Sequence, residues 1–473
     1  MVGRALAFAG RALTLARFGA ANALLNAFTN ALQVPNALFT VAGTALSTVM
    51  IPVYSGLLAK DKSDEARGFI NNVISVAMVL LAGLTLLGVL GAPLIARVVG
   101  GAAFEEAAFL IFALRAMMPV MLFFGLGAIF TGLLQSHGVF RLPALVSAPG
   151  GLLLIGYMLL GWQRFGVQGL VFVTITGVVL QPLLLVNAVR KLGIQYRFSI
   201  NLRDAHLRAA GRLCMPVLVS VVAYQAHFLF AHSVALRQGA AAVMDFSQQL
   251  VQVAGMILVL AVAQVYLPKL SALWAKNDHQ GYNDALRGAF TYVIFLVLPA
   301  AAGIFLLRAE IMTLLGIHAG ADLVGLYAIG IAFVALREIA DRGFYARQEA
   351  RTPAAFGVLM MAINITAVLL LVPRLGIQGI PIAYGLAAFI SAGGLLIFLQ
   401  QKTRFITSAF LYDLGKILLA AAFMAAVAWA AQVLFRESLN WENPLAAAAF
   451  PATLGAASYL SVARMLKINV GVR

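Results

Sequence analysis

Long uninterrupted apolar runs constrain the fold of this chain more than any other feature. FINNVISVAMVLLAGLTLLGVLGAPLI, from Phe69, and AMMPVMLFFGLGAIFTGLL, from Ala116, match or exceed the roughly 20 residues that a helix needs to cross about 30 Å of hydrocarbon. Hydrophobic residues make up 62% of the chain and charged ones only 11%, whereas soluble domains carry about 25% charged residues. No period-2 pattern of a transmembrane barrel competes. The sequence predicts an all-α integral membrane protein.

About fourteen transmembrane helices are expected along the 473 residues. The first is read as a retained span and not as a signal peptide, because Arg11 and Arg17 interrupt what would be an apolar core. The expected spans lie near 3–19, 22–57 (broken at Pro35), 68–99, 106–135, 141–162, 167–189, 209–235, 240–272, 283–307, 323–348, 354–373, 379–400, 409–433 and 445–466.

Basic residues fix an orientation for these spans. With both termini in the cytoplasm, 22 of the 33 Lys and Arg residues lie inside, six lie outside and five fall within spans. The positive-inside rule favours this arrangement. The net charge of +16 is scattered between apolar runs and forms no solvated basic domain, so nucleic acid is not an expected partner. The expected location is a bacterial cytoplasmic membrane.

The chain contains an internal repeat. RLPALVSAPGGLLLIGYMLLGWQRFGVQGL, from Arg141, aligns without a gap on RTPAAFGVLMMAINITAVLLLVPRLGIQGI, from Arg351. Upstream, IPVYSGLLAKDK and LPKLSALWAKND align at an offset of 216 residues. Each offset covers six helices, an even number, so the two copies enter the membrane from the same side, as in parallel-repeat transporters. The expected divisions are an N-terminal six-helix lobe, 1–205, a C-terminal six-helix lobe, 206–405, and two additional helices, 406–473.

Matched glycines end the repeated segment. Gly166 and Gly169 in one copy correspond to Gly376 and Gly379 in the other. Glycines at the same spacing in both copies indicate a tight turn whose backbone conformation is unfavourable for other residues.

A polar stripe lies at the start of the second span. Asn22, Asn26, Asn30 and Gln33 step by four, four and three residues, which places them on one helical face. The stripe fits the lining of a substrate cavity, and the alternative is hydrogen bonding between packed helices. Pro35 follows at once and is a candidate hinge, because proline removes one backbone hydrogen bond.

Two arginines of the first span, Arg4 and Arg11, are seven residues apart and share a face. Ionisable residues at membrane depth are functional candidates by default, and a guanidinium matches phosphate with two parallel hydrogen bonds. Both are candidate substrate-binding residues. The alternative for Arg4 is an anchor at the membrane surface.

A second polar face lies on the eighth span, with Asp245, Gln248, Gln249 and Gln252 as candidate substrate-binding residues. His227 and His232 of the seventh span titrate near neutral pH when unperturbed, and together with Asp245 they are candidates for ion or proton coupling. The alternative for each histidine is a packed, hydrogen-bonded imidazole.

Charged residues of the tenth span form two opposite-charge pairs, Arg337 with Asp341 and Glu338 with Arg342, at i, i+4 spacing. No phosphate loop, HExxH or GxSxG motif is present, and the single cysteine, Cys214, excludes an internal disulfide and a cysteine-clustered metal site. The expectation is a transporter without covalent chemistry, without a cofactor and without a bound metal.

The segment LQVPNALFTVAGTALSTVMIPVYSGLL, from Leu32, together with GLLQSHGVFRLPAL, VYLPKLSAL and RGFYARQEARTP, resembles the MurJ (MviN-type) lipid II flippases of the multidrug/oligosaccharidyl-lipid/polysaccharide exporter superfamily. The resemblance implies two six-helix lobes around a central cavity and a final helix pair that forms a groove for the undecaprenyl chain. It also implies transport of lipid-linked peptidoglycan precursor from the inner to the outer leaflet. We further expect a monomer in contact with membrane lipids and with the cell-wall synthesis machinery.

The chain departs from the pattern of the family it resembles at charged positions of three helices, and two alternatives stay open for this reason. One is an exporter of another polyprenyl-linked saccharide or of an amphipathic small molecule, and the other is a non-transporting scaffold derived from a flippase. Charged residues of the family pattern are replaced at Gly10, Asn26, Gln248, Gln249 and Gln252.

Overall fold

The computed structural model describes residues 2–58, 62–100, 106–192, 196–201, 203, 205–438 and 444–468, and within these ranges all regular structure is helical. The elements in chain order are α1 (Val2–Phe18), α2 (Ala23–Leu58), α3 (Ser63–Gly100), α4 (Ala107–Met117), α5 (Val120–Ser136), α6 (Arg141–Leu145), α7 (Ala148–Leu160), α8 (Trp162–Lys191), α9 (Ala205–Arg237), α10 (Ala241–Ala275), α11 (His279–Leu306), α12 (Arg308–Leu314), α13 (Ala321–Ala346), α14 (Arg351–Leu375), η1 (Gly376–Gln378), α15 (Gly379–Thr403), α16 (Ser408–Ser438) and α17 (Pro444–Met465).

The helices correspond to the fourteen expected spans. When α4 is joined to α5 and α6 to α7 across short kinks, and the short α12 is set aside, the described part of the chain holds fourteen long helical segments. Ten stretches of this part are long and apolar enough to cross a membrane, one of which, Arg351–Thr403, contains both α14 and α15. The chain is an all-α membrane protein, as its apolar runs predict.

Packing divides the chain into two compact units, Met1–Ala242 and Val243–Arg473. Helix α9 therefore packs with the first unit, although the repeat assigns it to the second lobe. The predicted lobe boundary at 205/206 separates two copies of a repeated helical unit. Packing does not test which helices are copies of each other, so the division into 1–205, 206–405 and 406–473 stays a prediction.

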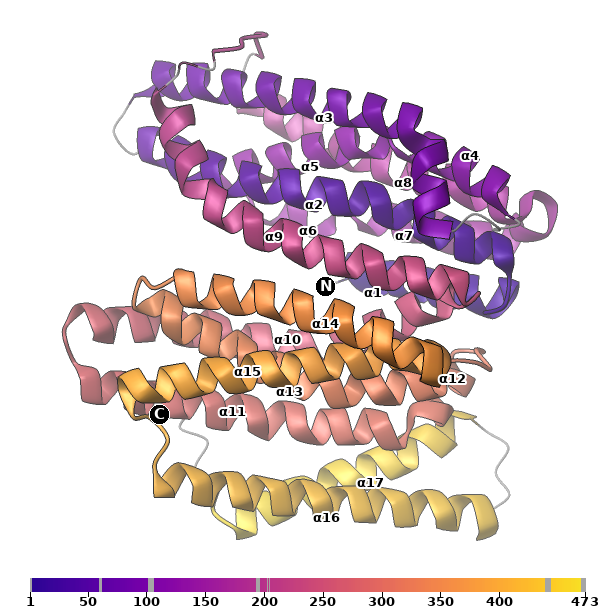
Figure 1. Cartoon of the computed structure of the whole chain (residues 1–473), viewed down its shortest axis with the longest axis vertical. Coiled ribbons are helices and arrows are strands. Elements are labelled where there is room, and N and C mark those ends of the chain that lie inside the picture. The colour runs from indigo at the N-terminus through magenta and orange to yellow at the C-terminus, as the bar shows by residue number, and fades with distance from the viewer. Residues whose placement is uncertain are drawn as a thin grey trace. The chain divides into compact units, whose positions relative to one another are not determined.

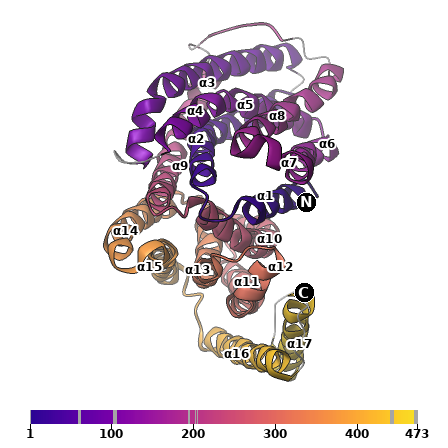
Figure 2. The same ribbon diagram turned by 90° about the vertical axis from the view of Figure 1, so that its right-hand side faces the viewer.

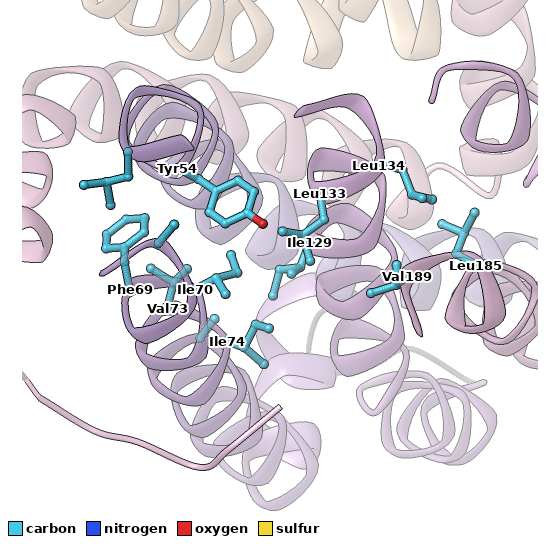
Figure 3. Close-up of a cluster of buried hydrophobic side chains, with 13 residues drawn as sticks. Tyr54, Phe69, Ile70, Val73, Ile74, Ile129, Leu133, Leu134, Leu185 and Val189 are labelled. Carbon is cyan, nitrogen blue, oxygen red and sulfur yellow. The ribbon is translucent and has the colours of Figure 1, made fainter. Parts of the chain in front are cut away.

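In the first unit α2 lies against α3, α4, α5 and α9 (Figure 1). A buried cluster joins α2, α3, α5 and α8: Phe69 and Ile70 of α3 meet Tyr54 of α2, with Leu133 of α5 and Leu185 of α8 nearby (Figure 3). Burial of a large apolar side chain stabilises a fold by about 1.5–3 kcal/mol in water, and in a membrane the same close packing supplies dispersion contacts between helices.

In the second unit α13 packs against α11 and α15, while α16 packs against α17 and α11 (Figure 2). The final pair is fixed to α11 by a small cluster of Ala420, Met424 and Tyr459 with Phe295. The Tyr459 hydroxyl donates a 2.7 Å hydrogen bond to the Phe295 carbonyl. This bond satisfies a polar group inside the bundle and sets the position of α17.

The glycines of the repeat confirm the predicted turns. Gly166 has φ 55° and ψ −151°, and its counterpart Gly376 has φ 60° and ψ −145°. This region of backbone space is essentially restricted to glycine. Gly169 and Gly379 serve close approach instead, because an added Cβ would lie 2.4 Å from the Tyr157 hydroxyl in one copy and 2.8 Å from the Val372 nitrogen in the other.

The predicted break at Pro35 is wrong: α2 continues as a helix from Ala23 to Leu58. Pro35 itself is buried. The missing N–H costs one hydrogen bond, and packing of α2 against four neighbouring helices holds the helix through that position. The role of Pro35 as a hinge stays a prediction.

Candidate functional site

The side-chain amide of Asn26, 1% exposed, joins three separate parts of the first unit. Its Nδ2 lies 2.8 Å from the Gly239 carbonyl, 3.0 Å from that of Asn22 and 3.2 Å from that of Ala20. Its Oδ1 accepts a 2.8 Å hydrogen bond from the backbone N–H of Ala242. Asn26 therefore ties α2 to the α1–α2 turn and to the α9–α10 turn.

The contact of α2 and α3 with α9 continues from Asn26 through further polar groups. The Asn30 Nδ2 donates to the His232 carbonyl at 3.1 Å. The Ser233 hydroxyl donates to the Val99 carbonyl at 2.7 Å, and the Arg237 guanidinium donates to the carbonyls of Val98 and Val99 at the end of α3. We call this set, Asn26, Asn30, His232, Ser233 and Arg237, the α2–α9 seam.

The other stripe residues have different surroundings. Asn22 caps α2, since its Oδ1 accepts a 2.9 Å hydrogen bond from the Leu25 N–H, as N-terminal caps do. Gln33 is 7% exposed. In this conformation the side chains of Asn26 and Asn30 form hydrogen bonds between packed helices. This arrangement corresponds to the alternative given above to the lining of a cavity.

Helix α1 lies against α7. Glycines make this approach close: a Cβ at Gly10 would lie 2.8 Å from Leu154, and one at Gly151 would lie 2.8 Å from the Ala7 nitrogen. Arg11 follows Gly10 and is partly exposed. Arg4 belongs to α1, but its side chain lies outside the residues that the structure describes.

On α10 the Gln249 amide donates a 2.5 Å hydrogen bond to the Asp245 carboxylate, so two of the four predicted polar residues meet directly. Asp245 and Gln248 are 8% and 7% exposed, respectively, whereas Gln249 and Gln252 are partly exposed. The carboxylate and the amides form one polar face along the first half of α10.

His227 and His232 are both buried in aromatic surroundings. The ring of His227 packs edge-on against Tyr224 at 4.9 Å, and the ring of His232 lies 4.4 Å from that of Phe228. Within the described part of the chain no group of three or more His, Cys, Asp or Glu side chains is placed to hold a metal ion.

The two predicted ion pairs of α13 are confirmed. Arg337 lies 3.6 Å from Asp341, and Arg342 pairs with Glu338. Arg337 also donates to the Ser391 hydroxyl of α15 at 3.1 Å, which in turn donates to the Phe356 carbonyl of α14 at 3.2 Å. These charges connect three helices of the second unit, a structural role.

A long apolar groove of about 760 Å³ runs between α11, α13, α15 and α16. All of its lining residues are apolar. On α11 the lining extends from Phe290 to Leu306 and on α16 from Phe410 to Ala425, each a rise of about 22–24 Å. The groove therefore covers most of the roughly 30 Å hydrocarbon thickness.

Sequence reasoning missed two parts of this arrangement. The seam residues Ser233 and Arg237 bind backbone carbonyls of α3, which no side-chain pattern encodes. Three of the four walls of the groove also escaped notice. The signal available for α11 was an apolar face at i, i+3, i+4 spacing through Phe290, Val293, Ile294 and Val297.

Comparison with known proteins identifies the family to which the chain is similar. The model of the family "Lipid II flippase MurJ" matches residues 15–443. A probable lipid II flippase MurJ of Bdellovibrio bacteriovorus is 25% identical over 88% of this chain and 83% of that protein. A probable lipid II flippase MurJ of Vibrio cholerae is 24% identical over 97% of this chain and 93% of its own length.

Solved structures agree in fold. A lipid II flippase MurJ in an inward closed conformation superimposes with a TM-score of 0.81, at 21% identity, over 98% of this chain and 96% of that one. An inward-facing multidrug resistance transporter of the MATE family gives 0.68 at 16% identity, over 87% of this chain and 96% of that one. With the family model matched along most of its length, the chain belongs to the MurJ family of lipid II flippases.

Proposed function

We propose that this protein moves lipid II, the lipid-linked peptidoglycan precursor, from the inner to the outer leaflet of the cytoplasmic membrane by alternating access. The main structural support for this proposal is the apolar groove of about 760 Å³. A flippase has to move a polar headgroup across hydrocarbon while the lipid tail stays in apolar surroundings, and this groove offers such surroundings along most of the membrane.

The tail is proposed to lie in the groove. Transfer of each methylene from an apolar to an aqueous environment costs about 0.8 kcal/mol, so a long polyprenyl chain is not expected to enter a polar cavity. One end of the groove lies beside the α15–α16 turn, where Phe405 and Ile406 line it. The predicted orientation places this turn at the cytoplasmic side, where the substrate is made.

The α2–α9 seam is proposed to act as the gate of the opposite, outer side. Its contacts are amide, hydroxyl and guanidinium donors on backbone carbonyls. Because water or a sugar hydroxyl can replace such a partner, the net free energy of each bond is only about 0.5–1.5 kcal/mol. A polar seam of this kind can open without leaving an unsatisfied group.

The headgroup is proposed to bind to the polar residues of the first, second and eighth spans. Arg4 and Arg11 provide guanidinium donors for the pyrophosphate, and the α10 face provides amide and carboxylate groups for the sugars. Opening of the seam would release the α2 amides for the same task, with Pro35 as the hinge and with His227, His232 and Asp245 as the coupling groups. The residues proposed to contact the headgroup are Arg4, Arg11, Asn22, Asn26, Asn30, Gln33, Asp245, Gln248, Gln249 and Gln252.

The remaining proposals concern surroundings and partners. We propose that the protein works as a monomer with both termini in the cytoplasm, that it performs no covalent chemistry, and that it operates beside the cell-wall synthesis machinery. The charge asymmetry of its loops supports the orientation.

The test is complementation in a bacterium whose own lipid II flippase is depleted. Expression of this chain is expected to restore labelling of lipid II at the outer face, and the groove variant Ala332→Trp is expected to restore much less. Restored growth without outward lipid II, or outward lipid II that stays at the depleted level while the protein is present in the membrane, would contradict the proposal. Changed drug sensitivity with no effect on lipid II would indicate an exporter of another amphipathic substrate.

A further inference from the structure

The link between α8 and α9 contains an extended segment, residues 196–201, with the sequence YRFSIN. We call it the strap. Its three large apolar side chains are far from buried: Tyr196 is 51% exposed, Phe198 70% and Ile200 47%. They alternate with polar Arg197, Ser199 and Asn201.

The strap is held on α3 by two polar side chains. Asn72 and Asn201 exchange two hydrogen bonds, one from the Asn201 N–H to the Asn72 Oδ1 at 2.8 Å and one from the Asn72 Nδ2 to the Asn201 carbonyl at 2.9 Å. The Ser75 hydroxyl accepts from the Ser199 N–H at 3.0 Å. The Ser75 hydroxyl donates its single hydrogen to the Asn71 carbonyl. It therefore acts as the acceptor in its 3.0 Å hydrogen bond with the Tyr196 hydroxyl.

The two pinning residues lie on the helix face that continues as the exposed apolar stripe of α3. Asn72, Ser75 and Val79 are spaced three and four residues apart, so they share one face. Phe69, Ile70 and Val73 point instead into the buried cluster (Figure 3). The exposed apolar residues of α3 are Val79, Leu80, Leu86, Leu87, Leu90, Leu94 and Val98.

The length of that stripe gives the depth of the strap. From Val79 to Val98 the helix rises about 28 Å, close to the roughly 30 Å of a bilayer's hydrocarbon core. Ser75 and Asn72 lie about 6 and 10 Å beyond Val79 along the axis, which is the depth of the lipid headgroups. The strap thus crosses α3 at the level of the lipid headgroups, from which its large side chains can reach the boundary with the acyl chains.

We propose that the strap is an in-plane membrane anchor that binds the anionic surface of the inner leaflet. Phe198, Tyr196 and Ile200 enter the boundary between headgroups and acyl chains, as aromatic side chains do at membrane interfaces. Arg197 and Arg203, both exposed, meet lipid phosphates, each basic residue contributing about 1 kcal/mol near an anionic surface. The proposal does not depend on the transported substrate.

The anchor explains a polar feature of α3. Without the strap, the amide of Asn72 and the hydroxyl of Ser75, which are 2% and 0% exposed, would face the membrane on an otherwise apolar stripe. With it, both are satisfied by the strap backbone, and the joint between the two repeats is fixed at a constant depth beside α3.

Spin labelling of the full chain in vesicles of phosphatidylethanolamine and phosphatidylglycerol tests the depth. With Cys214→Ala as background, a label at Phe198→Cys is compared with one at Leu87→Cys in the lipid-facing stripe and one at Lys276→Cys in the α10–α11 turn. The ratio of oxygen to nickel-chelate accessibility is expected to lie between those two references. A ratio equal to that of Lys276→Cys would overturn the anchor, and so would a label shielded from both reagents, which would mean a protein partner covers the strap.

The lipid charge is tested by the same label. Removal of phosphatidylglycerol in favour of phosphatidylcholine is expected to lower the ratio at position 198, and Arg197→Gln with Arg203→Gln is expected to abolish that dependence. A ratio that is insensitive to phosphatidylglycerol would overturn the binding of anionic lipid. Asn72→Leu serves as the structural control and is expected to raise the mobility of the label at least twofold without changing the helical content.

Discussion

The two units of the chain share a helical frame but place different chemistry on it. The first carries a polar seam in which Asn26 alone makes four hydrogen bonds. The second carries an apolar groove without a polar lining residue, and its charges in α13 are paired. Hydrogen bonds can be exchanged for substrate or water, whereas an apolar wall cannot bind a sugar. The contrast supports the proposal that the seam moves and that the groove holds the lipid tail.

The largest effect is expected at the seam. Asn26→Leu removes the partner of the Gly239 carbonyl and of the Ala242 N–H, and each buried group left without a partner costs about 1–3 kcal/mol. Outward lipid II labelling should fall to the level of depleted cells. Thr29→Val on the same helix is the matched control, because the hydrogen bond that it loses, from the Thr29 hydroxyl to the Leu25 carbonyl, lies within α2. Equal transport by Asn26→Leu and the natural chain would contradict the assignment of the seam as a gate.

A smaller effect is expected in the groove. Ala332→Trp fills part of the space lined by α13, and transport should fall about tenfold while the melting temperature stays nearly constant. Ala422→Trp on α16 is the control, since Ala422 is exposed and does not line the groove. If both variants reduce transport equally, the tail does not lie in the groove.

The shared frame is tested by the two turn glycines. Gly166→Ala and Gly376→Ala both force alanine into a backbone region that costs about 1–3 kcal/mol, and the two losses of unfolding free energy should agree within about 1 kcal/mol. Neither site has an atom within 4 Å of an added Cβ, so the loss reports backbone strain alone. A large inequality would mean that the two copies do not share this turn.

The smallest effect concerns Glu349 in the α13–α14 turn. Burial by itself would raise the pKa of this carboxyl, but hydrogen bonds from Lys402 and Thr352 and the charges of Lys402 and Arg347 outweigh it and lower the pKa below its usual value. A lowered pKa stabilises the fold above the unfolded-state value, near 4.3, and this contribution is lost as pH falls through the folded value. Glu349→Gln should remove a small part of the acid sensitivity between about pH 3 and 5, measured as thermal unfolding against pH, and leave transport at pH 7 unchanged. Identical acid profiles would contradict the assigned ion pair.

The fold was largely accessible from the sequence because its signals are local. Apolar runs of 20 residues or more locate helices to within a few residues, and the matched spacing of Gly166 and Gly376 predicted the turn that each of them forms. The ion pairs of α13 followed from i, i+4 geometry. Pro35 misled because tertiary packing, which a local pattern does not contain, holds α2 helical past it.

The candidate site was accessible only in part. Periodicity showed that Asn26 and Asn30 share a face, but their partners are backbone groups more than 200 residues away in sequence, and backbone groups are the same at every residue. The groove is built from faces of four helices, each of which resembles an ordinary lipid-facing stripe. Only the assembled bundle shows that these faces converge.

Lipid II transport by this chain can be measured as the rate at which lipid II becomes accessible at the opposite face of proteoliposomes that contain the purified chain. If the chain transports lipid II, exposure is expected to be faster than in protein-free vesicles, about tenfold slower with Ala332→Trp than with the natural chain, and not accelerated at all with Asn26→Leu. Exposure no faster than in protein-free vesicles, for chain that is folded and correctly inserted, would contradict lipid II transport by this chain.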